Sequence, residues 1–376
     1  MSGQTLTIPP PAATPAPGPA APRMLTGDRP TGRLHLGHYV GSLANRVRLH
    51  KQYESFFIVA DLHMLTTKNS ADDIAAVRRN ATDMVLDSLA AGLDPAHSVF
   101  FLQSAVPEVA EISLLLSSLV TVPRLERIPS LKEMARDAGK REMPFALLGY
   151  PVLQAADILS VKAAAVPVGR DNAAHVEVAR EIARRFNRRY GPVFPVPALV
   201  HGDVPSLPGT DGQAKMSKSL GNAIYLADPP DEVRRKVLRM YTDPARTGPG
   251  VPGTVDGNPV FAYHAAFNDR PAEVADLAER YRSGQVGDVE VKEKLAAAIN
   301  RFLAPIQERR AYFQAQDGLI DQLIVTGTMR TRREVQRTLT DMRNTMGLTA
   351  VFTEFQNHAR HAPRAEGPPP SLCLER

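Results

Sequence analysis

The sequence is short of cysteine and tryptophan and has no long apolar run. Its 376 residues include one cysteine, Cys373, and no tryptophan. A single cysteine excludes an intrachain disulfide and a metal site built from several cysteines, and it favours a reducing, cytoplasmic location. No stretch approaches 18 consecutive apolar residues, so the sequence predicts no membrane-spanning helix. The rest of the composition is that of an ordinary globular protein, and the chain is long enough to bury a large core.

Both ends of the chain lack the pattern of a folded domain. Residues 1–22 contain seven prolines and five alanines but no lysine or arginine. A secretory signal or a mitochondrial presequence needs basic residues, so neither is predicted there. We expect residues 1–23 to form a disordered, Pro/Ala-rich extension and residues 353–376 to form a largely disordered tail.

Between these ends, apolar runs alternate with helical patterns. Short buried strands are predicted at 24–26, 56–60, 99–102, 166–168 and 198–200. Helical spacing follows at 39–53, 70–92, 110–120 and 174–190, and Ser70 with Asp73 resembles a capping box. This alternation predicts an α/β fold, a Rossmann-like doubly wound parallel sheet, over residues 24–229.

After residue 229 the strand signals fade. Helices are predicted at 231–241, 272–283, 289–317 and 331–345, which indicates a smaller α-helical domain over residues 230–352. Residues 292–343 carry ten basic and six acidic side chains, and the whole chain has a net charge of +5. This balance suits either a solvated helix surface or a face that binds a polyanion such as RNA.

The first candidate motif, His35-Leu36-Gly37-His38, comes shortly after the first strand. Ligands of doubly wound sheets bind beyond the carboxyl ends of the strands, where helix N-termini offer backbone N–H groups to phosphates. Gly37 leaves room for a flat base, and His35 and His38 can donate hydrogen bonds to phosphate oxygens. The alternative is two ordinary histidines at a helix start. A zinc site is not predicted, because no third ligand follows at a suitable spacing.

The second candidate motif is Lys215-Met216-Ser217-Lys218-Ser219, with glycines on both sides. Flanking glycines suit a mobile loop that closes over a ligand, and two ammonium and two hydroxyl groups suit a triphosphate. The spacing is not that of a Walker A loop. The alternative is a flexible basic surface loop.

Together, in this order, the two motifs resemble the signatures of the class I aminoacyl-tRNA synthetases. The resemblance implies attack of an amino acid carboxylate on the α-phosphorus of ATP, with pyrophosphate leaving. Because that carboxylate is already ionised, no general base is needed, and catalysis consists of positioning and charge stabilisation. ATP is thus implied as a substrate, with Mg²⁺ carried on its phosphates. The implied catalytic residues are His35, His38, Lys215 and Lys218.

Four further segments, at 27–32, 61–63, 150–159 and 166–175, resemble the tryptophanyl-tRNA synthetases. The resemblance covers about residues 24–348. It implies a Rossmann catalytic domain with an insertion, a helical anticodon-binding domain over 230–352, a homodimer, and L-tryptophan and tRNA(Trp) as partners.

The same resemblance implies the binding residues. Tyr150, Gln154 and Asp157 are spaced to share one face of a helix, and Asp157 is implied to accept the indole N–H while Tyr150 contacts the α-amino group. His63 and Asn172 complete the implied amino-acid site. The implied ATP contacts are Arg29, Pro30, Thr31, Gly37, His38, Gly169, Arg170, Asp171, Leu207, Lys215, Met216, Ser217, Lys218 and Ser219.

Three positions depart from the pattern of that family. Gln154 stands where methionine is common, and Asn172 and Arg29 each stand where glutamine is usual. A Tyr-x-x-x-Gln-x-x-Asp pattern is also typical of the tyrosyl-tRNA synthetases, so tyrosine is the competing substrate. Two other functions remain open: an adenylating ligase that uses a different acceptor, and a non-enzymatic paralogue with a binding or regulatory role.

Overall fold

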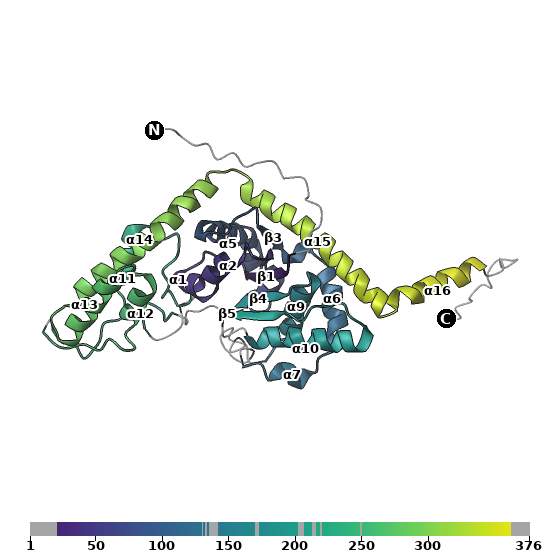
Figure 1. Ribbon diagram of the computed structural model, residues 1–376, viewed down its shortest axis with the longest axis horizontal. Coiled ribbons are helices and arrows are strands. Elements are labelled where there is room, and N and C mark those ends of the chain that lie inside the picture. Colours follow the sequence, from purple (N-terminus) through teal and green to yellow (C-terminus); the bar gives the residue numbers. More distant parts are fainter. Residues whose placement is uncertain are drawn as a thin grey trace, which may run out of the picture.

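The computed structural model describes most of the chain (Figure 1). The residues described are 21–129, 131, 134, 142–169, 173–201, 207–212, 216–218, 220–248 and 250–361.

At the centre lies a five-stranded parallel sheet, as the sequence predicts. Its strands are β1 (Arg23–Asp28), β2 (Glu54–Val59), β3 (Ser98–Leu102), β4 (Ala165–Val168) and β5 (Ala198–His201). Their spatial order is β3-β2-β1-β4-β5, and every pairing is parallel. The direction of winding therefore reverses between β1 and β4, and a crevice at this switch point is where such sheets bind ligands.

The strands form because their apolar side chains are buried on both faces of the sheet. In β2, Phe57 and Val59 pack into one core, while Phe56 and Ile58 pack into the other. The first core also contains apolar residues of α2 (Ala44–Leu49), α5 (Val77–Ala91) and α14 (Asp288–Gln314). The second contains those of α6 (Glu108–Ser117), α9 (Phe145–Ser160) and α10 (Ala173–Tyr190). This two-sided burial explains the uninterrupted apolar runs in the sequence.

Short and long helices connect the strands. Their bounds are α1 (Leu36–His38), η1 (Tyr39–Leu43), α2 (Ala44–Leu49), α3 (Asp61–Met64), α4 (Ala71–Ala75), α5 (Val77–Ala91), η2 (Gln103–Ala105), α6 (Glu108–Ser117), α7 (Val122–Glu126), α9 (Phe145–Ser160) and α10 (Ala173–Tyr190). The Ser70–Asp73 capping box is confirmed at the start of α4. The helix predicted over 70–92 is divided in the structure: α4 ends at Ala75, α5 begins at Val77, and the side chain of Ile74 on α4 is exposed.

The last part of the chain is helical, also as predicted. Its helices are α11 (Pro230–Leu238), α12 (Pro259–Phe267), α13 (Pro271–Arg282), α14 (Asp288–Gln314), α15 (Leu319–Thr345) and α16 (Leu348–His361). In the described part of the chain, no helix has both the length and the apolarity needed to span a lipid bilayer.

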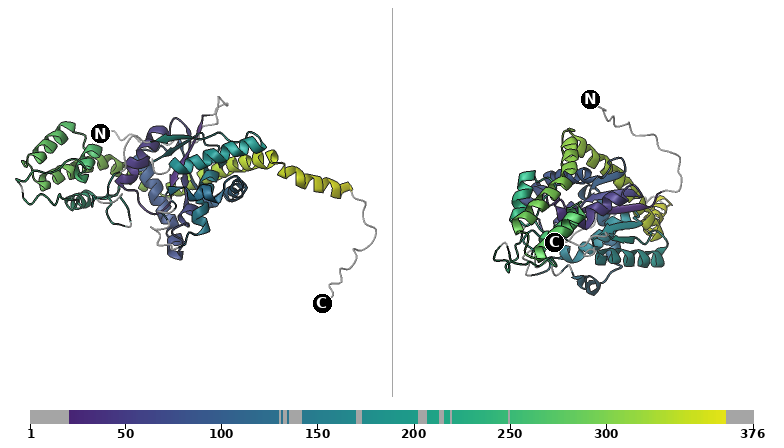
Figure 2. Two further views of the ribbon diagram at one scale, coloured as in Figure 1. Left: turned by 90° about the horizontal axis from the view of Figure 1, so that it is seen from below. Right: turned by 60° about the vertical axis from the view of Figure 1, so that its left-hand side comes forward.

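Two boundaries differ from the sequence expectation. The helices after residue 229 do not form one separate unit, because α15 turns back and lies along β3 at the edge of the sheet (Figure 1). Residues 353–361, expected in a disordered tail, instead continue α16, which projects from the body of the molecule in Figure 1 and in the left view of Figure 2. Apolar residues at 348, 351, 352 and 355 give this segment the spacing of a helix.

Candidate active site

The first motif forms the helix start that follows β1. His35 is the N-cap of α1, and its Nδ1 accepts a hydrogen bond from the His38 backbone N–H at 3.3 Å. In return, His38 Nδ1 accepts the backbone N–H of His35 at 3.2 Å. The two rings lie 3.7 Å apart. The π-helical turn η1 follows directly, an irregularity common at functional sites.

The second motif touches the first across the fold. The Gly37 N–H lies 3.3 Å from Met216 Sδ, although the two residues are 179 positions apart. Lys218 Nζ donates to the Gly32 carbonyl at 2.8 Å and to Thr31 Oγ1 at 3.3 Å. The structure therefore brings together Gly37, Met216 and Lys218, which the sequence assigned to one ATP site. Lys215 and Ser219, from the same motif, lie outside the described residues.

Two charged groups beside this contact have shifted pKa values. Burial lowers the pKa of the Lys218 ammonium to about 8, although Asp28 and Asp87 oppose the shift. Burial alone would raise the pKa of Asp28, but the Arg46 guanidinium outweighs it and lowers that pKa to about 2. Arg46 holds both carboxylate oxygens of Asp28 and also donates to the Gly27 carbonyl at 3.2 Å.

A cavity of about 490 Å³ opens at the switch point of the sheet. Its walls come from the carboxyl ends of β1, β2 and β4, from η1 and from α9 and α10. The residues that the sequence assigned to the site and that line this cavity are Arg29, Thr31, His38, His63, Tyr150, Gln154, Asp157 and Gly169. The side chain of Leu207, which was also assigned to ATP, is buried in the hydrophobic core that contains Met216. Arg170, Asp171 and Asn172 lie outside the described residues.

The far end of the cavity carries the predicted amino-acid residues on α9. Asp157 is buried, and its Oδ2 accepts a hydrogen bond from His63 Nε2 at 2.7 Å. Tyr150 is also buried, and its hydroxyl shares a 2.6 Å hydrogen bond with His175 Nε2. Burial raises the pKa of the Asp157 carboxyl, and its hydrogen bond with His63 opposes that shift.

Sequence reasoning assigned no role to four residues of this site: Asp28, Arg46, Gln103 and His175. Gln103 donates to both oxygens of Asp157, and Arg46 pairs with Asp28. Gln103 directly follows β3, and polar residues at the carboxyl end of a parallel strand are a usable signal. Arg46 gave no such signal, because it lies inside a helical pattern.

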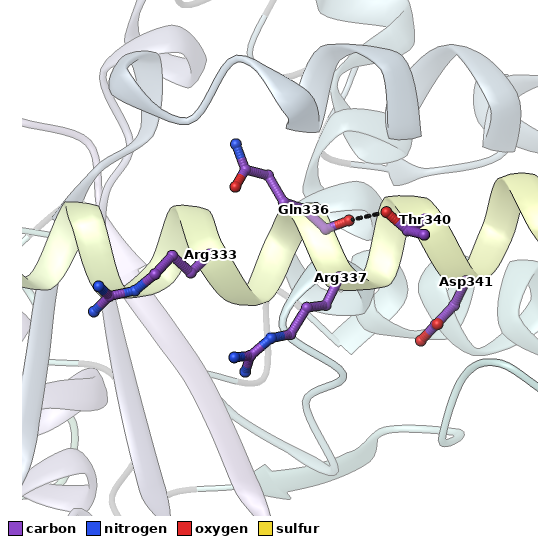
Figure 3. Close-up of a pocket in the computed structure, with 5 residues that line it drawn as sticks. All are labelled: Arg333, Gln336, Arg337, Thr340 and Asp341. Carbon is purple, nitrogen blue, oxygen red and sulfur yellow. Dashed lines mark hydrogen bonds between the residues drawn. The ribbon is translucent and has the colours of Figure 1, made fainter.

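A second concavity lies on the outer face of α15 (Figure 3). It is lined by Arg333, Gln336, Arg337, Thr340 and Asp341, and Thr340 Oγ1 donates to the Gln336 carbonyl at 2.9 Å. All its residues come from one helix, and Gln336 points away from Arg337. Among the described residues, no group of three or more His, Cys, Asp or Glu side chains could hold a metal ion. The cavity at the switch point is therefore the candidate active site.

Comparison with known proteins agrees with this geometry. The family model described as "tRNA synthetases class I (W and Y)" matches residues 19–304. The tryptophan–tRNA ligase of Treponema pallidum is 57% identical over 328 residues, which is 87% of this chain and 97% of that protein. The enzyme of the same name from Borreliella burgdorferi is 51% identical over 89% of this chain and 96% of its own length.

A solved structure agrees as well. The tryptophanyl-tRNA synthetase of Campylobacter jejuni, crystallised with ADP and tryptophan, superposes with a TM-score of 0.74 at 30% identity. The match covers 86% of this chain and 99% of that one. This chain therefore belongs to the class I tRNA synthetases for tryptophan and tyrosine, and within them to the tryptophan–tRNA ligase family.

Proposed function

We propose that this protein activates L-tryptophan with ATP and then transfers it to tRNA(Trp). The first step forms tryptophanyl-adenylate and releases pyrophosphate, and the second esterifies the 3′-terminal ribose of the tRNA. The observation that carries the proposal is the contact of the two motifs, Gly37 with Met216, beside a cavity that also contains Asp157. Lys218 of the second motif also reaches Thr31 in the turn before the first motif.

In the first step, an oxygen of the tryptophan carboxylate attacks the α-phosphorus of ATP. The bond from that phosphorus to the oxygen bridging to the β-phosphate breaks, and the electron pair leaves with pyrophosphate. No proton has to be removed, because the carboxylate is ionised at neutral pH. His35, His38, Lys215 and Lys218 would stabilise the negative charge that develops on the pyrophosphate. Mg²⁺ would enter with the ATP phosphates.

The lining of the cavity supports the roles of the described residues, and the family resemblance supports those of the others. Asp157 would accept the indole N–H, with His63, Tyr150, Gln154 and Asn172 around the rest of the amino acid. The turn from Arg29 to Thr31, with Gly37 and Gly169, would hold the adenosine. Arg170, Asp171 and Leu207 complete the proposed nucleotide contacts, together with the loop at 215–219.

Tyrosine is the competing substrate, and one observation favours it. Gln154 lines the cavity on the same face of α9 as Asp157. An amide and a carboxylate together could hold a phenol hydroxyl, which both donates and accepts. Against this, the relatives of highest identity reported above are tryptophan–tRNA ligases.

ATP–pyrophosphate exchange, measured with tryptophan and tyrosine side by side, tests the proposal. We expect exchange with tryptophan, and a fall of at least about a hundredfold in kcat/KM for Asp157→Asn, because its amide cannot accept from every donor around it. Exchange with tyrosine alone would overturn the choice of amino acid. Exchange with neither amino acid would overturn the proposal that the protein is an enzyme and favour a paralogue with a binding role.

Charging of tRNA tests the second step. A protein that exchanges pyrophosphate but does not charge tRNA(Trp) would be an adenylating ligase with another acceptor. The helices from α11 onward would supply the anticodon contacts. A cytoplasmic location stays a prediction that rests on the single cysteine, Cys373.

A homodimer is part of the same proposal. Three large apolar side chains are exposed on neighbouring helices: Leu114 on α6, Val122 on α7 and Phe145 on α9. A partner copy would cover them, since exposed apolar patches mark interfaces. Light scattering should give the mass of a dimer, and Phe145→Glu should give a monomer. The control Phe355→Glu, at another exposed phenylalanine on α16, should leave the dimer intact.

A further inference from the structure

The carboxylate of Asp157 already has donors around it in the described structure. Gln103 Nε2 lies 3.0 Å from Oδ1 and 2.9 Å from Oδ2, and His63 Nε2 lies 2.7 Å from Oδ2. Among the described residues, Oδ2 thus accepts from two side chains, and Oδ1 accepts from that of Gln103 alone. Since a carboxylate oxygen can accept two hydrogen bonds, Oδ1 has room for one more donor.

The side chain of Gln103 is fixed at both ends of its amide. Its Oε1 accepts the backbone N–H of His63 at 3.3 Å, which leaves the NH₂ group facing Asp157. Gln103 has no exposed surface and starts η2 at the carboxyl end of β3. The next residue, Ser104, donates its N–H to Asp61 Oδ1 at 3.0 Å and so ties η2 to α3. The amide therefore cannot flip without losing hydrogen bonds on both sides.

The charges around Asp157 make its ionised form depend on these donors. Burial raises the pKa of Asp157, and the neighbouring carboxylate of Asp61 raises it further, while His63 and Gln103 lower it. Two other titratable groups that line the cavity, Tyr150 and His175, are hydrogen-bonded to each other. Without the Gln103 donor, the protonation equilibrium of Asp157 moves toward the neutral carboxylic acid. The neutral acid can donate a hydrogen bond as well as accept one.

We propose that Gln103 is a positioning residue for amino-acid recognition: it holds Asp157 as a pure acceptor and leaves Oδ1 directed to a ring N–H. The indole nitrogen of tryptophan has only this donor to offer, so the arrangement selects for it. This inference rests on the proposed activation of tryptophan and adds to it a second residue of specificity. Gln103 itself acts through Asp157 and need not touch the substrate.

Gln103→Met tests the inference, since methionine fills similar space without a donor. The readout is the ratio of kcat/KM for tryptophan to kcat/KM for its benzothiophene analogue, in which sulfur replaces the indole N–H. We expect KM for tryptophan to rise about tenfold to a hundredfold with kcat changed less than about threefold, and the ratio to fall about tenfold. Gln307→Met is the matched control. It removes a half-buried amide on α14, which donates to the Asp228 carbonyl at 2.8 Å, and it should change neither quantity.

A double-mutant cycle with Asp157→Asn completes the test. Gln103→Met should have almost no effect on the tryptophan-to-analogue ratio of kcat/KM once residue 157 carries no charge. A merely structural role for Gln103 would weaken both substrates equally, and an unchanged ratio would overturn the inference. A ratio that falls equally in the Asp157→Asn background would also overturn it. If the wild-type protein shows no exchange with tryptophan, the proposed function and this inference both fail, whereas exchange with an unchanged ratio removes the inference alone.

Discussion

Asp28 and Arg46 form a partly buried ion pair in the wall of the cavity, where a lone carboxylate would repel phosphates; the Asp28 side chain is 24% exposed. Arg46 is 7% exposed at its side chain and grips both oxygens of Asp28. Removing one member of such a pair leaves the other charge unpaired and away from water. The resulting loss of stability exceeds the stability that the intact pair contributes. The pair therefore neutralises the cavity wall and fixes η1–α2 to the end of β1.

We predict that Asp28→Asn lowers the free energy of unfolding by about 2–3 kcal/mol at neutral pH, measured by urea denaturation. The pKa of Asp28 is lowered from 3.8 to about 2, so the carboxylate contributes stability above its unfolded pKa and loses it as the pH falls. The gap between the two proteins should therefore narrow from about pH 4 toward pH 2. A gap independent of pH would contradict the ion pair.

The double variant Asp28→Leu/Arg46→Met is the control for this prediction. It removes both charges, so no charge is left unpaired, and we expect it to unfold closer to wild type than Asp28→Asn does.

The shifted pKa of Lys218 leads to a prediction about how the rate of ATP–pyrophosphate exchange depends on pH. Its pKa of about 8 means that the ammonium is present below pH 8 and lost above it. In the proposed mechanism only the charged form of Lys218 can stabilise the leaving pyrophosphate, so kcat/KM for ATP in the exchange assay should fall as the pH rises through about 8. In Lys218→Arg the alkaline fall should move above pH 9, because guanidinium stays charged. The same alkaline fall in both proteins would assign it to another group.

For individual residues, the sequence predicted those of the two motifs and of the α9 face, but not the side chains that form hydrogen bonds with them. His35, Gly37 and Asp157 stand in recognisable patterns. Gln103 and Arg46 become important only through contacts with residues 54 and 18 positions away. Such contacts depend on how strands order in the sheet, which local patterns do not contain.

Among the elements, α15 makes the closest approach to the sheet. Gly327 faces the backbone of β3, and a Cβ built on it would lie 1.9 Å from the Phe100 carbonyl oxygen. In an isolated helix, alanine would be favoured over glycine by about 1 kcal/mol. The contact with a backbone atom outweighs this preference, because neither the strand nor the helix can move aside locally.

Gly327→Ala is therefore expected to destabilise the protein by about 2 kcal/mol or more in urea denaturation. Gly149→Ala is the matched control in α9, where an added Cβ has open space. It should leave stability unchanged or raise it by up to about 1 kcal/mol. Equal effects of the two substitutions would show that helix propensity, not packing against β3, decides at Gly327.

The arginines of α15 also bear on the choice between a solvated surface and an RNA face. Arg330 pairs with Glu54, Arg332 with Glu108 and Arg343 with Glu111. These side chains hold α15 to β2 and α6, so the excess of basic residues there serves packing in large part. This favours an ordinary protein surface over an RNA face for α15, and it leaves α11–α14 for the proposed anticodon contacts.

The strands and most helices were predictable because their apolar periodicity is strong. Helix α12 was not, because Val260, Phe261, Tyr263 and Phe267 bury it on several sides and remove the amphipathic pattern. The start of α15 was placed 12 positions too late for the opposite reason: exposed Val325 and Met329 blur its apolar stripe.

On the scale of the whole molecule, the fold joins motifs that are far apart in the chain. β1 carries the first motif and neighbours β4 at the switch point, while the second motif follows β5 and returns to the first. The doubly wound topology could be predicted from alternation alone. The return of the loop after β5 could not, since it rests on contacts such as that of Met216 with Gly37.

The end of the molecule gives the last prediction. Gly347, in the left-handed conformation, ends α15, and α16 beyond it has no buried residue. A chain that ends at Gly347 should therefore keep its free energy of unfolding within about 0.5 kcal/mol and its exchange rate within about twofold. A chain that ends at Arg330 should fail to fold stably, because it loses Val335 and Met342, which are fully buried against the sheet. A marked loss of stability on removing α16 alone would mean that its apolar stripe packs against the body in solution.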